Sequence, residues 1–271
     1  MGSGNPKSSV VSAAALLAAA AWSLPGCHRQ LPEPSARVLR VVTWNIHGCL
    51  TGIDPIVDEL RRLDADVICL QEAEADTTHT AGADQAASIA RRLGMRHFSA
   101  GSALPAGGEQ RMAILCKQML RQPASLHGGT GRVYGVTAII HWQERALRIV
   151  SVHFTSSYRP DPKHVLKTSR ARSKEATDLA KRLQQWSGQC IVAGDFNSTP
   201  GMPVHDHIAK HLAGLPTPRP TYPSGNPVLA IDHVFCSKGL RVDRPSVGAT
   251  QVSDHLAVLA KIRLLSEDSE P

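Results

Sequence analysis

The chain between residues 38 and 264 alternates short apolar runs with stretches in which apolar residues recur every three or four positions. Short apolar runs are typical of buried strands, and the longer period is typical of amphipathic helices. Strands are predicted at 38–46, 67–70, 112–116, 133–142, 147–154, 191–193, 230–236 and 256–264. Helices are predicted at 53–63, 84–93, 205–212 and around 176–183. This alternation predicts an α/β or α+β domain rather than an all-helical one.

The links between these elements are also informative. A short polar link at 143–146 separates two long apolar runs, which favours an antiparallel hairpin. A basic, proline-containing loop is predicted at 156–168, and 214–227 carries five prolines that cannot sit in a central sheet. Residues 38–265 are therefore predicted to form one folded domain, followed by a polar tail at 266–271.

The N-terminal segment differs from the rest of the chain. Residues 10–24 are dominated by Ala, Val and Leu, follow the single Lys7, and are shorter than the about 20 residues of a membrane span. We therefore predict a signal peptide at 1–26, a tether at 27–37, and an exported, periplasmic or cell-surface protein. Cys27 follows Leu-Pro-Gly, which resembles the lipobox of bacterial lipoproteins, but Pro25 departs from the usual pattern. Lipid anchoring through Cys27, ordinary signal-peptide cleavage and retention as an anchor remain three open alternatives.

The cysteines and the net charge limit which kinds of site and partner the chain can have. Four of the six cysteines, Cys69, Cys116, Cys190 and Cys236, lie in or beside apolar runs and are predicted to be small buried hydrophobes rather than disulfide partners. No cysteine or histidine spacing is typical of a zinc site. The formal net charge of +7 is compatible with polyanionic partners, from nucleic acid to phospholipid headgroups, without choosing between them.

Six of the predicted strands or loops end in acid, amide or imidazole side chains. Such groups are costly to bury alone, so their repeated occurrence at strand ends indicates one shared polar site. Alternation along a strand places two of them, Asp195 and Asn197, on one face and Phe196 on the other. The complete set is Asn45, Glu72, His153, Asp195, Asn197, Asp232, Asp254 and His255.

The segments that carry these residues read TWNIHG, VICLQE, IVSVHF, AGDFNSTP, TYPS with IDHVF, and SDHLAV. In this order they resemble the signature blocks of the endonuclease/exonuclease/phosphatase superfamily, which includes pancreatic-type deoxyribonucleases, abasic-site endonucleases, neutral sphingomyelinases and inositol-polyphosphate phosphatases. The resemblance implies an α/β (α+β) four-layer sandwich of two mixed or antiparallel β-sheets flanked by helices. It also implies phosphoester hydrolysis with Mg²⁺ or Mn²⁺.

The same resemblance implies residue roles. Glu72 corresponds to the principal metal ligand, Asn45 lies near it, and Asp254 corresponds to an acid near the metal or near a second metal position. A hard cation of this kind prefers carboxylate oxygen.

His255 corresponds to the histidine beside the scissile phosphate, and Asp232 to the carboxylate that orients its imidazole. Asp195 corresponds to the group that activates the attacking water. Asn197 and His153 correspond to phosphate ligands.

Two further interpretations concern residues outside this set. Glu109 is a candidate partner for His153, because some family members pair a glutamate with that histidine. The basic cluster Arg170, Arg172 and Lys174 is interpreted as a solvated helix face rather than a phosphate clamp.

Three functions remain open. The first is a phosphodiesterase acting outside the cytoplasm on nucleic acid or phospholipid headgroups. The second is a phosphomonoesterase on a phosphorylated lipid or sugar, and the third is a non-catalytic, surface-anchored binding module. The loops 76–83 and 156–168 are predicted to select the substrate, and no protein partner is implied.

Overall fold

The computed structural model describes Met1 and residues 38–265, except 130, 158, 214–216 and 218. The predicted signal peptide, Cys27, the tether and the polar tail at 266–271 lie outside the described residues. Among the helices that the structure describes, none is both long and apolar enough to cross a membrane.

The first sheet has seven strands. Its order is β10-β12-β1-β2-β4-β3, with β11 paired to β12. Only β1 and β2 are parallel in this sheet, and its other pairs are antiparallel. The strands are β1 Leu39–Asn45, β2 Val67–Ala75, β3 Arg96–Ala103, β4 Glu109–Cys116, β10 Leu240–Val242, β11 Ser246–Val247 and β12 Val258–Leu264.

The second sheet has five strands in the order β5-β6-β7-β8-β9. The predicted hairpin is confirmed, because β6 and β7 pair antiparallel across residues 143 and 144, whereas β7 and β8 are parallel. The strands are β5 Arg121–His127, β6 Val133–Trp142, β7 Arg145–His153, β8 Gln189–Asp195 and β9 Asp232–Cys236.

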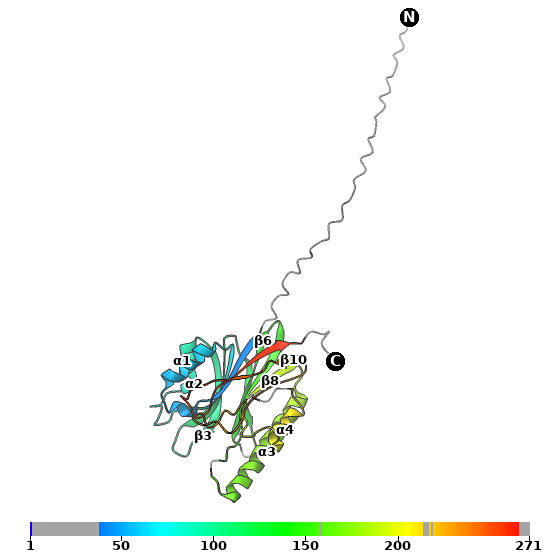
Figure 1. The fold of residues 1–271 in the computed structure, drawn as a ribbon. Helices are drawn as coiled ribbons and strands as arrows, with labels where there is room; N and C mark the ends of the chain where they lie inside the picture. Colours follow the sequence, from blue (N-terminus) through cyan, green and yellow to red (C-terminus); the bar gives the residue numbers. More distant parts are fainter. Residues whose placement is uncertain (2–37, 130, 158, 214–216, 218, 266–271) are drawn as a thin grey trace. The chain divides into compact units, whose positions relative to one another are not determined.

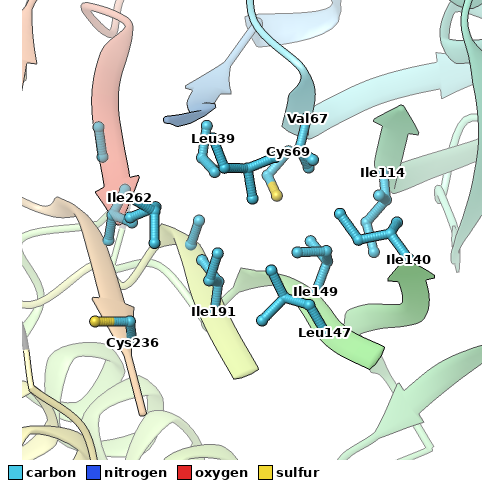
Figure 2. Packing of buried hydrophobic residues seen from close by; sticks show 14 of the residues in the cluster. Leu39, Val67, Cys69, Ile114, Ile140, Leu147, Ile149, Ile191, Cys236 and Ile262 are labelled. Atoms are coloured by element: carbon cyan, nitrogen blue, oxygen red, sulfur yellow. The ribbon is translucent and has the colours of Figure 1, made fainter. Parts of the chain in front are cut away.

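Helices cover the outer face of each sheet, so the predicted four-layer sandwich is confirmed (Figure 1). The helices are α1 Ile53–Leu63 and α2 Gln85–Leu93 on the seven-stranded sheet, α3 Pro162–Gln185 and α4 Pro203–Ala209 on the five-stranded sheet, and a short 3₁₀ helix η1 at His47–Cys49. The central core lies between the sheets, where Cys69 and Ile114 of one sheet face Ile140 and Ile149 of the other (Figure 2).

Five buried cysteines are free in the described residues, which confirms the predicted hydrophobic role of Cys69, Cys116, Cys190 and Cys236. Burial is the main cause that raises the pKa of the Cys69 thiol to about 12. These thiols therefore act as packing groups rather than as nucleophiles.

Several elements differ from the sequence prediction. The short strands β10 and β11 were not predicted, and neither were β3 and β5. Strands β3 and β5 lie at sheet edges, where one side has no pairing partner and the apolar pattern is weak. The predicted loop at 156–168 is wrong in its second half, because α3 begins at Pro162. Asp161 caps this helix by accepting a hydrogen bond from His164 N, and proline at the first helical position is favourable.

Candidate active site

The carboxyl ends of two parallel strand pairs lie at the same edge of the sandwich. In the five-stranded sheet, His153 at the end of β7 is in register with Asp195 at the end of β8, which in turn is in register with Asp232 of β9. In the seven-stranded sheet, Asn45 ends β1 beside Gln71 of β2. Parallel pairing therefore brings side chains from distant segments to one edge.

Glu72 reaches this edge through a bulge. The β2–β4 register shifts between Leu70 and Ala73, and Glu72 has a φ of 56°, in the left-handed region that non-glycine residues rarely adopt. Its side chain is 22% exposed and lines the pocket. The sequence prediction placed Glu72 at a strand end, whereas β2 continues to Ala75 beyond the bulge.

Asp232 and His255 form a buried hydrogen-bonded pair. His255 Nδ1 lies 2.9 Å from Asp232 Oδ2, which also accepts a hydrogen bond of 2.6 Å from the Thr221 hydroxyl. The Trp44 indole donates to the His255 carbonyl over 2.9 Å and fixes its backbone. Because Nδ1 faces Asp232, Nε2 is the atom that faces Asp195, at 3.8 Å from Oδ2.

The protonation of His255 is determined by two opposing effects. Burial pushes the pKa of this imidazole down, but the negative charges of Asp232 and Asp195 and the hydrogen bond to Asp232 outweigh burial and raise it to about 10. His255 is therefore an imidazolium at neutral pH.

Asp195 is a buried acid, and burial favours its neutral form. It is 1% exposed, and burial is the main cause that raises its pKa to about 7, with the negative charge of Asp232 adding to the effect. Its oxygens accept hydrogen bonds from the Asn197 amide at 2.8 Å and from Asn45 Nδ2 at 3.2 Å, which partly offset the shift. A carboxylate with a pKa near neutrality is suited to accept and release protons.

His153 lies between the two halves of the site with a free ring nitrogen. Its Nε2 is 3.6 Å from both Glu72 Oε1 and Asp195 Oδ2, beyond hydrogen-bond distance. This buried atom has no hydrogen-bond partner in the described residues. Burial, reinforced by the charges of Arg132 and His255, holds the pKa of His153 well below its usual range, so the ring is neutral. A buried polar atom of this kind indicates a place where a ligand contributes the missing partner.

The residues at this edge fit a divalent cation. Asn45 Nδ2 donates to Glu72 Oε1 over 3.1 Å and to Asp195, so one amide orients both carboxylates. Glu72 offers carboxylate oxygen, which Mg²⁺ and Mn²⁺ prefer, beside the unpartnered nitrogen of His153. Asp254 lines the same pocket and lies 3.4 Å from His47 Nδ1.

A second cluster also has metal-like spacing. Ligand atoms of Asp195, Asp232 and His255 all lie within 4.8 Å of one another. However, His255 Nδ1 and Asp232 Oδ2 already bond to each other, and an imidazolium cannot bind a cation. We therefore assign this cluster to proton chemistry and the Glu72 side to the cation.

These residues surround a pocket of about 460 Å³. Six of the eight predicted site residues line it, while Asn45 and Asp232 are buried behind the carboxylates and the imidazole that they orient. The lining is His47, Glu72, His153, Ser156, Ser157, Val165, Arg172, Asp195, Asn197, Thr199, Met202, Tyr222, Leu229, Ile231, Asp254 and His255.

Arg172 belongs to this pocket, so its interpretation as part of a solvated helix face is wrong. Its guanidinium donates to the Asn197 carbonyl and, over 3.2 Å, to the Ser157 hydroxyl. Burial lowers the pKa of Arg172, and the charges of Asp195 and Glu175 oppose this shift. The sequence contained a signal for this position. Arg172 lies four residues after buried Thr168 and four before buried Ala176, on the helix face that packs inward.

The predicted pairing of His153 with Glu109 is also wrong. Glu109 begins β4 and forms an ion pair of 2.7 Å with Arg111, which in turn bonds Asp84. The acids nearest to His153 Nε2 are instead Glu72 and Asp195.

Asn197 differs in detail from its expected role as a phosphate ligand, since its Nδ2 donates to the Phe154 carbonyl over 3.0 Å.

A sandwich of two β-sheets between helices, with carboxylates and imidazoles gathered at one edge of both sheets, defines a hydrolase of the α/β sandwich class. The Endonuclease/Exonuclease/phosphatase family matches residues 42–255. The chain belongs to this family, whose enzymes commonly use divalent metals.

Solved structures share the fold. An endonuclease/exonuclease/phosphatase from Beutenbergia cavernae has a TM-score of 0.68 at 20% identity, covering 84% of this chain and 72% of that one. The human Nocturnin catalytic domain, with bound sulfate, has 0.64 at 21% identity, covering 84% and 94%. A 3′-5′ exonuclease from Neisseria meningitidis has 0.66 at 13% identity, covering 82% and 98%. No curated protein matches the chain.

Proposed function

We propose that this chain is a divalent-metal-dependent phosphodiesterase that works outside the cytoplasm. The observation that carries the proposal is the convergence of Glu72, His153, Asp195 and His255 on one pocket, with a cationic imidazole and an acid of near-neutral pKa side by side. No covalent nucleophile is needed for hydrolysis by water.

The site residues divide the chemistry between them. Asp195 accepts a proton from the attacking water, whose oxygen forms a bond to phosphorus as one ester P–O bond breaks, and the departing oxygen takes up a proton and leaves as an alcohol. The His255 imidazolium stabilises the negative charge that develops on the phosphate oxygens, and the His153 nitrogen and the Arg172 guanidinium provide further contacts to them. A cation beside Glu72 would neutralise the same charge when bound.

The test is hydrolysis of a soluble chromogenic phosphodiester by the full-length chain with Mg²⁺, with Mn²⁺ and with EDTA. We expect metal-dependent turnover that is retained by Asp58→Asn, which changes an exposed acid that pairs with Arg61 one turn along its helix. Turnover of a chromogenic phosphomonoester alone would assign the phosphomonoesterase alternative. Binding of phosphodiester without turnover of either compound would instead support the binding module.

Export is part of the proposal and has its own test. We propose that residues 1–26 are removed on export and that Cys27 then anchors the protein. Mass spectrometry of the mature chain from membrane and soluble fractions should show an acylated Cys27 at the N-terminus, and Cys27→Ser should move the protein to the soluble fraction. A mature chain that still begins at Met1 would contradict cleavage.

A further inference from the structure

Large apolar side chains on the surface of the domain are concentrated at the mouth of the active-site pocket. In the described part of residues 38–265, seven such side chains are exposed: Leu50, Met119, Val165, Leu166, Met202, Val228 and Leu229. Val165, Met202 and Leu229 line the pocket, while Leu166 and Val228 adjoin two of them in the chain. We call these five residues the apolar rim.

The rim comes from three separate segments. Val165 and Leu166 lie in the first turns of α3, which project beyond the strands in Figure 1, and Met202 precedes α4. Val228 and Leu229 are held in place because both of their amides donate to the Tyr222 carbonyl. Single exposed apolar residues are ordinary, but several around one opening mark an interaction surface.

The charge beside the rim is positive. Lys163, Lys167 and Arg170 are exposed on the first turns of α3, and none of them forms an ion pair with a described residue. Asp161 is the acid nearest to Lys163 and Lys167 in sequence, and it caps the helix. Glu175 is nearest to Arg170, and it forms an ion pair with Arg132. Aliphatic side chains flanked by lysine and arginine are the composition that binds the surface of an anionic bilayer.

His153 also lines a second cavity of about 630 Å³, whose walls combine polar residues such as Ser102 and Gln110 with apolar ones such as Leu104 and Met112. A phosphodiester bound at His153 would therefore have two cavities beside it for its two substituents, and the apolar rim belongs to the first of them.

We propose that the apolar rim seats the active site on a phospholipid bilayer, and that the substrate is the phosphodiester of a membrane lipid. This inference rests on the proposed phosphodiesterase function. Hydrolysis adds water across one P–O ester bond, and the released alcohol takes the proton. Nucleic acid is disfavoured because a single-strand channel uses stacked aromatic rings along a basic groove, whereas Tyr222 is the one such ring among the pocket residues.

The experiment compares two substrates with the full-length chain. Mixed vesicles of phosphatidylcholine, phosphatidylglycerol, phosphatidylethanolamine and sphingomyelin provide membrane phosphodiesters, and a chromogenic diester provides a soluble one. We expect Leu166→Ser/Val228→Ser to lower vesicle hydrolysis on the order of tenfold, because burial of such side chains drives interfacial binding. Neither residue lines the pocket, so turnover of the soluble diester should stay unchanged.

Two controls make the result specific. Met119→Ser changes another exposed apolar residue, 60% exposed and outside the pocket lining, and should leave both activities unchanged. Lys163→Glu/Lys167→Glu should reduce vesicle hydrolysis in proportion to the anionic lipid content and should matter less at high salt.

Each remaining outcome has a definite meaning. Turnover of the soluble diester without hydrolysis of any vesicle lipid overturns the lipid assignment and leaves the phosphodiesterase standing. Equal vesicle activity in the rim variant and the parent overturns the role of the apolar rim in seating the active site. Cleavage of plasmid DNA or RNA with vesicles untouched overturns it in favour of nucleic acid. Absence of turnover on both the soluble diester and the vesicles removes the proposed function, and this inference with it.

Discussion

The two sides of the pocket differ in exposure. On the closed side, the side chains of Asp195, Asp232 and His255 are at most 6% exposed. His255 hydrogen-bonds to Asp232, and Asp195 accepts hydrogen bonds from Asn197 and Asn45. On the other side, Glu72 is 22% and Asp254 36% exposed, and both line the open pocket. The same residue types thus occupy two environments only a few ångströms apart.

This difference explains how similar groups can serve different purposes. Burial shifts the pKa values of Asp195 and His255, so the closed side is suited to acid–base chemistry. Open carboxylates stay available to a hydrated cation, which keeps several of its waters. His153 joins the two sides through its 3.6 Å approaches to Glu72 and Asp195.

The largest predicted effect comes from the closed side. Asp195→Asn keeps the shape of the side chain but removes the proton acceptor, so kcat/KM for the diester should fall about 10³-fold or more. Saturating metal should not restore it. Steady-state kinetics with circular dichroism as a folding check measures this, and an active, folded variant would refute the role of Asp195.

Asp232→Asn should have the next largest effect. Without its negative charge, burial dominates and the pKa of His255 falls from about 10. We expect kcat/KM to drop about 10²-fold at pH 8 and the alkaline limb of the pH–rate profile to move to lower pH. Asp206→Asn is the matched control, since Asp206 lies 3.1 Å from His205 Nδ1 outside the pocket lining. A profile that stays in place would contradict the pairing.

The sequence predicts the centre of this molecule better than its edges. Strands such as β1 and β8 are buried on both faces, so their apolar runs are continuous. By contrast, β3 and β5 are edge strands, and β5 includes an exposed proline, Pro123, so neither shows the pattern of a buried strand.

The site residues divide in the same way, into those that the sequence predicts and those that it does not. Residues at strand ends, such as His153 and Asp195, could be predicted because strand direction alone brings them together. The left-handed bulge at Glu72 could not, because it depends on the β2–β4 register. Arg172 reaches the pocket from a helix, and only the packing of α3 on its sheet reveals which face points inward.

Glu72→Gln tests the open side and should have a smaller effect. Loss of one carboxylate weakens cation binding, so the metal concentration for half-maximal activity should rise about tenfold or more, with much of kcat recovered at saturating metal. Metal titration of diester hydrolysis measures this. Glu74→Gln is the control, because Glu74 bonds Thr77 and His79 and does not line the pocket. An unchanged metal requirement in Glu72→Gln would place the cation elsewhere.

The smallest predicted effect is the change of the free energy of unfolding with pH in the absence of metal, and this change reports mainly on His255. Its folded pKa of about 10 exceeds the about 6.5 of an unfolded histidine, so its stabilisation is complete below pH 6.5 and is lost as pH rises towards 10. Asp195, with a folded pKa of about 7, retains only a small part of its proton-linked stabilisation at pH 7 and has lost it by about pH 8, and buried thiols contribute only above about pH 8.5.

Between pH 7 and 8.5, the free energy of unfolding should therefore fall by about 2 kcal/mol, mainly because of His255. Urea titrations in EDTA at both pH values measure this change, and His255→Gln should remove most of it. An equal fall in the variant would show that other groups carry the pH dependence. The closed side would then lack the cationic imidazole that distinguishes it from the open side.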